Sequence, residues 1–549
     1  MPALFHPRSL VLAALSLTAA GALASAAATA SSGDALPDRK FCAESAGPVA
    51  LGSAQWNGWG RGFENTRYQP EPAIRASDVP KLALKWAFGY PGSAAAGQPT
   101  IADDRVFVTS AAGRIYALDS KSGCIYWTYD APAGVRTAVS IGEFGPAKKV
   151  PQPKKSKHKL GLAHLDVQKA PSAVFFGDER GAVYALDAQR GTLLWKTQVD
   201  AHPMARIQAA PTLYQDRLYV AVASSEPSAA GDASYACCTF RGSVAALDIA
   251  TGRMLWKSYL VNEEPRPYRK TLAGIQEFGP AGVPVLASPT VDVGRGLVYV
   301  ATGSSYTAIE QPLADAIVAL SLVDGSLRWA KKTAPQEAGA AGFDSSPILR
   351  TLSNGRQVIL AGQRSGLIVS LDPDRAGEVL WQTKISEGNA VGGVEWGAAA
   401  DHRNLYVALS GLTAEPMDLS GSLTALDMKT GAKRWQTPAP APECTWGAQG
   451  CAHAQAQAVT VIPGVVFSGS MDGHLRAYSI IDGKILWDTE TAKDFATVNG
   501  VKASGGSLDQ GGATIVNGVL YVNSGSGPRD GQHVGQPGNV LLAFSVDGK

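Results

Sequence analysis

The chain has 549 residues, and its 49 basic and 47 acidic side chains leave a formal charge of only +2. This balance excludes the strongly basic surface that a nucleic-acid-binding domain presents. The length exceeds the roughly 100–200 residues of one ordinary domain. Length alone therefore suggests several domains.

The first thirty residues have the features of a secretory signal peptide. An apolar run over 10–24 follows a basic residue, and small residues after it offer cleavage sites. The run is too short, and wrongly flanked, for a membrane anchor. We therefore expect a signal peptide at 1–30, export to the periplasm or the exterior, and an extension at 31–80 that packs on the domain after it.

From residue 81 onward the chain repeats one cassette, an apolar stretch and a turn followed by Gly and, four residues later, Trp. A turn with Asp and Gly between two apolar runs predicts a hairpin. Runs such as YALD are apolar on both faces, which suits a strand sandwiched between neighbouring sheets. Two more strand-like runs precede each cassette, so each unit has four strands, as in a β-propeller blade. The pairs are Gly123/Trp127, Gly191/Trp195, Gly252/Trp256, Gly325/Trp329, Gly377/Trp381, Gly431/Trp435 and Gly483/Trp487.

The number of blades follows from the two ends of the repeat. An eighth cassette stops at Gly548 and Lys549, before its outer strand and its Trp. Near the start, 81–88 reads as a lone strand that carries Trp86. If this strand completes the last blade, the ring closes with eight blades and without an exposed edge. We predict an all-β, eight-bladed propeller over 81–549, in which the cassette Trp side chains pack between blades and have no catalytic role.

A basic cluster, AKKVPQPKKSKHK, interrupts the second unit at 147–159. Its Pro and Lys content favours a solvated loop. Docking of an acidic redox partner is the alternative interpretation.

The six cysteines fit an oxidising compartment. Cys444 and Cys451 enclose a short loop and predict a local disulfide. Cys237 and Cys238 are adjacent, and a bridge between neighbours persists mainly where function requires it. Two unlinked thiols are the alternative there. By default, the last two cysteines, Cys42 and Cys124, form the third pair.

Several segments together resemble the pyrroloquinoline quinone (PQQ) alcohol dehydrogenases, and within them the polyvinyl alcohol dehydrogenases. These segments are the ALDxxTGxxxW repeats, the adjacent cysteines followed by Arg and Gly, and the runs HPMARIQAAP, GQRSGLIVSLDPD, GGVEWGAAAD, FSGSMDGHLRAYS and DFATVNGVKASGGSLD. The resemblance spans residues 56–549. Fold likeness alone does not carry function, so each site residue is considered separately.

The resemblance implies a planar quinone with three carboxylates on the propeller axis. Such a ligand requires cationic and hydrogen-bonding neighbours. The adjacent cysteines would cover one face of the ring. The other candidate cofactor-binding residues at matching positions are Arg136, Arg206, Arg241, Arg364, Glu395, Trp396 and Asn499.

The resemblance also implies a calcium ion, which prefers oxygen ligands. Glu226 and Ser304 stand at the metal-ligand positions. A base would remove the alcohol proton while hydride moves to the quinone. Asp344 is the candidate base, and Arg364 would lie near the reactive oxygens. The sequence has no CxxCH haem motif, so a separate cytochrome c, or a dye, would accept the electrons.

Three positions depart from the family pattern. Leu286 stands where relatives place a Trp on the open face of the quinone, and Ser304 stands where an Asn commonly binds calcium. The segment before Ser345 lacks the usual pair of acidic residues, and Asp344 is the carboxylate that is left.

Two classes of function are consistent with these residues. The first is PQQ-dependent oxidation of secondary alcohols, either polymers such as polyvinyl alcohol or small molecules. The second is a non-catalytic propeller that serves as a binding or scaffold protein at the cell envelope. The cysteine pair and the arginines favour the enzyme, and the three departures favour the scaffold.

Overall fold

The computed structural model describes residues 40–52, 55–145, 171–333, 342–386, 393–411, 420–442, 444, 446–447, 451–526 and 535–549. The predicted signal peptide and the basic cluster 147–159 lie outside the described residues. All the described structure below belongs to the part of the chain after residue 39.

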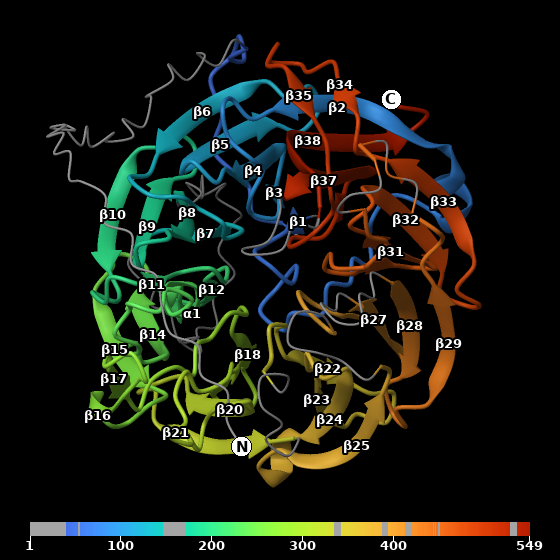
Figure 1. Cartoon of the computed structure of the whole chain (residues 1–549). Helices are drawn as coiled ribbons and strands as arrows, with labels where there is room; N and C mark the ends of the chain where they lie inside the picture. The colour runs from blue at the N-terminus through green and yellow to red at the C-terminus, as the bar shows by residue number, and fades with distance from the viewer. Residues whose placement is uncertain are drawn as a thin grey trace, which may run out of the picture. The chain divides into compact units, whose positions relative to one another are not determined.

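The described residues form eight antiparallel sheets of four or five strands around a common axis (Figure 1). We number these sheets as blades 1–8 in the order of their cassettes. Blade 1 holds β1 (Gln55–Trp56), β3 (Thr100–Ala102), β4 (Arg105–Thr109), β5 (Arg114–Asp119) and β6 (Ile125–Asp130). Blade 2 holds β7 (Ser140–Glu143), β8 (Ser172–Gly177), β9 (Ala182–Asp187) and β10 (Leu193–Gln198). Blade 3 holds β11 (Ala205–Arg206), β12 (Thr212–Tyr214), β13 (Arg217–Ser224), β14 (Ser243–Asp248) and β15 (Met254–Tyr259). Blade 4 holds β18 (Thr290–Asp292), β19 (Leu297–Ala301), β20 (Ala316–Ser321) and β21 (Leu327–Lys332).

The other four blades repeat the same meander. Blade 5 holds β22 (Ile348–Thr351), β23 (Gln357–Gly362), β24 (Leu367–Asp372) and β25 (Glu378–Lys384). Blade 6 holds β26 (Ala399–Ala400), β27 (Asn404–Ser410), β28 (Gly421–Asp427) and β29 (Lys433–Pro438). Blade 7 holds β30 (Thr460–Ile462), β31 (Val465–Gly469), β32 (His474–Ser479) and β33 (Ile485–Glu490). Blade 8 holds β36 (Thr514–Val516), β37 (Val519–Ser526), β38 (Pro537–Val546) and β2 (Leu82–Gly89).

A few short elements lie in the connections between the strands of the blades. They are α1 (Glu226–Ala229), the 3-10 helices Ala76–Lys81 and Pro373–Arg375, and the hairpins β16–β17 (Arg266–Lys270, Gln276–Gly279) and β34–β35 (Asp494–Phe495, Ala503–Ser504).

The ring is closed by a strand from the start of the chain. β2 pairs antiparallel with β38, in a register that runs from Leu82 opposite Val546 to Gly89 opposite Val540. The outer strand missing from the C-terminal cassette is therefore supplied by 81–88, as predicted. The predicted eight-bladed propeller is confirmed.

The cassette Trp of one blade lies over the cassette Gly of the next. In seven successive pairs, from Trp86 over Gly123 to Trp435 over Gly483, a Cβ placed on the glycine would come within 2.4–3.0 Å of the indole ring. These glycines also have φ near +70°, a region that side chains disfavour. The spacing of Gly and Trp is therefore set by contact between blades, and the predicted packing role is confirmed.

The same indoles also bond the next blade. Seven of the eight donate Nε1–H to a backbone carbonyl there, for example Trp195 to Ile249 at 2.8 Å and Trp487 to Leu82 at 3.1 Å. The last of these bonds joins blade 7 to the strand that closes blade 8.

The N-terminal extension occupies the inner edges of the blades. Its residues 55–69 bond the innermost strands of successive blades, as where Val291 donates to Phe63, Leu349 to Glu64 and Ala400 to Thr66. An innermost strand has one unpaired edge, so this segment satisfies backbone groups that would otherwise lack partners on the axis. In Figure 1 the segment, which begins with β1, lies near the centre of the ring.

Arg67 of this segment is fully buried. Its guanidinium donates to the carbonyls of Val459 and Trp59, at 2.5 and 2.7 Å, and to the side chains of Gln98 and Thr460. All four acceptors are neutral, and burial lowers the pKa of Arg67 to about 9. The bonds tie the axial segment to blades 1 and 7.

All six cysteines are paired, as Cys42–Cys124, Cys237–Cys238 and Cys444–Cys451. These are the three expected disulfides. The first joins the N-terminal extension to the cassette turn of blade 1.

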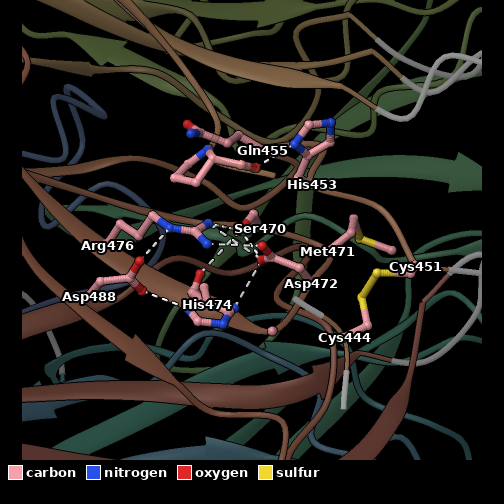
Figure 2. Close-up of polar contacts among 12 residues, drawn as sticks. Cys444, Cys451, His453, Gln455, Ser470, Met471, Asp472, His474, Arg476 and Asp488 are labelled. Atoms are coloured by element: carbon pink, nitrogen blue, oxygen red, sulfur yellow. Dashed lines mark hydrogen bonds and ion pairs between the residues drawn. A yellow bond between two sulfur atoms is a disulfide. The ribbon is translucent and has the colours of Figure 1, made fainter. Parts of the chain in front are cut away.

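A buried charge network fixes the turn between β31 and β32 in blade 7. Figure 2 shows the Arg476 guanidinium between Asp472 and Asp488, at 2.9 Å from each carboxylate, with His474 Nδ1 2.7 Å from Asp488. Arg476 also donates to Ser470 at 2.7 Å. Two carboxylates face one guanidinium, so protonation of His474 makes the network neutral. The bond to Asp488 accordingly raises the pKa of His474.

The contact between indole and glycine predicts a specific loss of stability. Gly431→Ala places a methyl group 2.5 Å from the Trp381 ring, whereas Gly355 has a similar positive φ and no atom within 4 Å. Both variants acquire backbone strain of roughly 1–2 kcal/mol. Only in Gly431→Ala should the free energy of unfolding fall by about 1–3 kcal/mol more, because the added methyl group overpacks the contact with Trp381. Urea unfolding of the two variants measures the difference, and equal losses would contradict the packing role.

The blade 7 network predicts a pH-dependent stability. Because the folded pKa of His474 is raised, its contribution is complete below the unfolded value near 6.5 and is lost as pH rises through the folded value. His474→Asn should therefore cost more unfolding free energy at pH 6 than at pH 9. As a control, His402→Asn should show no such excess at pH 6, because the His402 ring bonds Arg350 rather than a carboxylate.

Candidate active site

Two kinds of connection carry the predicted site residues. One leads into the innermost strand of a blade, as at Arg136 before β7 and Asp344 before β22. The other joins the second and third strands, as at Arg364 between β23 and β24. In an antiparallel meander the first strand begins at the end of the blade where the second strand finishes. Both connections therefore emerge at one end of the axis, which we call the mouth.

Glu226 holds the segment that follows the adjacent cysteines. It is the first residue of α1, immediately beyond β13, and its side chain is fully buried. The carboxylate accepts the backbone N–H of Thr239 at 2.7 Å and of Phe240 at 2.9 Å, and the hydroxyl of Tyr235 at 3.1 Å. The predicted metal ligand thus also anchors the Cys237–Cys238 loop at the mouth.

Asp344 and Arg364 form an ion pair, with Arg364 Nε donating to Asp344 Oδ2. The backbone N–H of Arg364 donates to Gly342 at 3.1 Å. The Ser304 hydroxyl lies 3.4 Å from where a Cβ on Gly342 would stand, and it donates to Asp315 at 2.7 Å. The two predicted catalytic residues and the predicted second metal ligand therefore meet where blades 4 and 5 adjoin.

Arg136 and Arg206 converge on one carboxylate, that of Glu179. Arg136 Nε lies 2.7 Å from Glu179 Oε1 and Arg206 Nη1 lies 3.6 Å from it. Glu179 belongs to the turn between β8 and β9, which corresponds to the Arg364 turn of blade 5. Glu179 was not predicted from the sequence, because a single charged residue in a hairpin turn gives no signal of its own.

Three other candidates make their contacts with different groups. Arg241 lies over the Tyr259 ring at 3.9 Å and bonds the exposed Glu264. Asn499 bonds both backbone groups of Gly89 and so holds the end of β2. Trp396 donates to Asp509 at 2.5 Å.

Glu395 is buried, whereas Leu286 is only partly buried. The cofactor contact predicted for Glu395 stays a prediction.

A second residue that the sequence analysis missed is Tyr306, in the connection after β19. Burial raises its pKa, the charges of Glu226 and Asp344 raise it further, and Arg364 opposes them. The phenol is therefore within the electrostatic influence of both Glu226 and the Asp344–Arg364 pair.

The side chains described above supply only part of the oxygen ligands that a calcium site needs. Within the described ranges no group of three or more His, Cys, Asp or Glu side chains is close enough to hold a metal. Glu226 and Asp344 supply hard oxygen atoms, whereas calcium takes six to eight. Hydroxyls, carbonyls, water or the cofactor itself would have to supply the remainder.

The sequence matches known families over most of its length. A family profile described as "Glucose/ethanol/alcohol dehydrogenase, beta-propeller domain", of the PQQ group, matches residues 56–384. A second profile, described as "Outer membrane protein assembly factor BamB", matches residues 364–527.

Two curated relatives are named polyvinylalcohol dehydrogenase. The one from Pseudomonas sp. is 42% identical over 91% of this chain and 79% of its own length. The one from Sphingopyxis sp. is 38% identical over 93% and 80%.

Solved structures of quinohemoprotein alcohol dehydrogenases share the fold. The one from Pseudomonas putida has a TM-score of 0.65 at 18% identity, and the one from Comamonas testosteroni has 0.62 at 19%. Each comparison covers 90% of this chain and 81% of the other. With the family profile and the two relatives, these findings show that the chain belongs to the PQQ-dependent alcohol dehydrogenases.

Proposed function

We propose that the chain oxidises secondary alcohols, either polyvinyl alcohol or smaller molecules, with PQQ and calcium bound at the mouth and a separate cytochrome c as electron acceptor. The two relatives named polyvinylalcohol dehydrogenase support this substrate class. The observation that carries the proposal is the Asp344–Arg364 ion pair. The charges of this pair and of Glu226 all act on Tyr306.

The charge balance at the mouth supports a metal ion together with the quinone. Three guanidiniums and three carboxylates are balanced among six of these side chains, which are Arg136, Arg206, Arg364, Glu179, Glu226 and Asp344. A trianionic cofactor needs further positive charge in a partly buried site. A calcium ion at Glu226 and Ser304 would supply it and suits their oxygen atoms.

When bound, PQQ would accept the hydride, and calcium would polarise the quinone carbonyl beside it. Asp344 would take the proton from the alcohol hydroxyl, because an ionised carboxylate held at the site is a competent base. Arg364 would orient this carboxylate through its Nε–H bond. Arg136 and Arg206 would bind carboxylates of the cofactor.

We also propose export, either to the periplasm or to the exterior of the cell. Three disulfides favour an oxidising compartment. Among the described residues no helix is long and apolar enough to cross a membrane. The signal peptide that would direct export stays a prediction, because 1–30 lies outside the described residues.

Asp344→Asn tests the base. Purified protein is loaded with PQQ and calcium, separated from free cofactor by gel filtration, and assayed for dye reduction with 2-propanol and polyvinyl alcohol. The variant should keep the quinone absorbance and lose about 10²–10⁴-fold in turnover. Asp130→Asn, which breaks the remote Arg114–Asp130 pair, is the control. Wild-type turnover in Asp344→Asn would exclude Asp344 as the base.

Arg136→Gln and Arg206→Gln test the anion contacts. Each removes one charged hydrogen-bond donor, so the Kd for PQQ should rise about tenfold or more. Arg114→Gln, at the surface pair on blade 1, should leave the Kd unchanged. Titration of apoprotein with PQQ measures the Kd of all three variants. A wild-type Kd in both Arg136→Gln and Arg206→Gln would mean that the cofactor carboxylates bind elsewhere.

A further inference from the structure

Tyr306 rests on the segment that Glu226 holds. Its ring stacks on that of Phe240, with 6.3 Å between centroids and 28° between planes. The backbone N–H of Phe240 in turn donates to the Glu226 carboxylate at 2.9 Å. The position of the phenol ring is therefore fixed relative to the predicted metal ligand and the adjacent cysteines.

The connection that carries Tyr306 also touches the other half of the mouth. Ser304, two residues earlier, lies against Gly342, and Gly342 accepts the backbone N–H of Arg364. Tyr306 thus stands on a connection that touches both halves of the mouth.

The Tyr306 hydroxyl is available to a ligand. Within the described part of the chain no group hydrogen-bonds it, and the residue is only partly buried. The hydroxyl therefore has no acceptor among the described residues, although polar groups in such surroundings usually have a partner.

We infer that Tyr306 positions the cofactor, by donating a hydrogen bond from its hydroxyl to an oxygen of the bound quinone between Glu226 and Asp344. This inference rests on the proposed function. It adds to the mouth a neutral donor, which holds an oxygen atom without changing the charge balance.

Tyr306→Phe tests this role, because it keeps the ring and removes only the hydroxyl. Titration of the full-length apoprotein with PQQ in the presence of calcium should give a Kd about tenfold weaker than that of the wild type. Tyr299→Phe is the matched control in the same blade. It removes a hydroxyl that bonds Asp292 at 2.8 Å, so its Kd should stay within twofold.

Tyr306→His provides a second variant, since it keeps a ring with an N–H donor and should recover part of the lost affinity. Wild-type affinity in Tyr306→Phe, or equal losses in the Phe and His variants, would overturn the role of the hydroxyl. A wild-type chain that retains no quinone would instead overturn the proposed function itself. Thermal unfolding should place Tyr306→Phe close to the wild type, because the hydroxyl makes no bond within the described chain.

Discussion

The contact of an indole ring with a glycine in the neighbouring blade holds the ring of sheets together. Each cassette glycine leaves space for the Trp of the blade before it. Seven of the eight indoles also donate an N–H hydrogen bond to a backbone carbonyl of the next blade, as Trp195 does to Ile249. Blades joined in this way have a fixed rotation about the axis. The last step depends on β2, since Trp487 bonds Leu82 and β2 pairs with β38. Loops from distant parts of the sequence meet at the mouth because this geometry repeats eight times.

The mouth combines charged groups that cancel one another. Glu179 neutralises part of the charge of Arg136 and Arg206, and Asp344 pairs with Arg364. Such pairs keep guanidiniums in place before a ligand arrives, which lowers the cost of ordering them on binding. The axial segment 55–69 fills the space along the inner strands. The binding chemistry is therefore concentrated in the loops of the mouth.

The blades could be predicted because their signal is local and repeated. The spacing of Gly and Trp marks each hairpin, and the incomplete last cassette identified 81–88 as the closing strand. The convergence of Asp344 with Arg364 was expected from the family resemblance. Glu179 and Tyr306 were missed because single residues in hairpin connections carry no periodic signal. The sequence also does not show in which direction a side chain points. Arg241 follows the cysteines closely in the sequence, but its guanidinium lies over the Tyr259 ring.

The central claim is that the mouth binds the quinone between the adjacent cysteines and the Asp344–Arg364 pair. A crystal structure of the protein grown with PQQ and calcium tests it most directly. The account predicts planar density on the axis, against Cys237–Cys238, with a metal ion touching Glu226 and with carboxylates of the ring at Arg136 and Arg206. Quinone density outside the mouth, or beside Arg241 and Glu264 at the edge of blade 3, would contradict it.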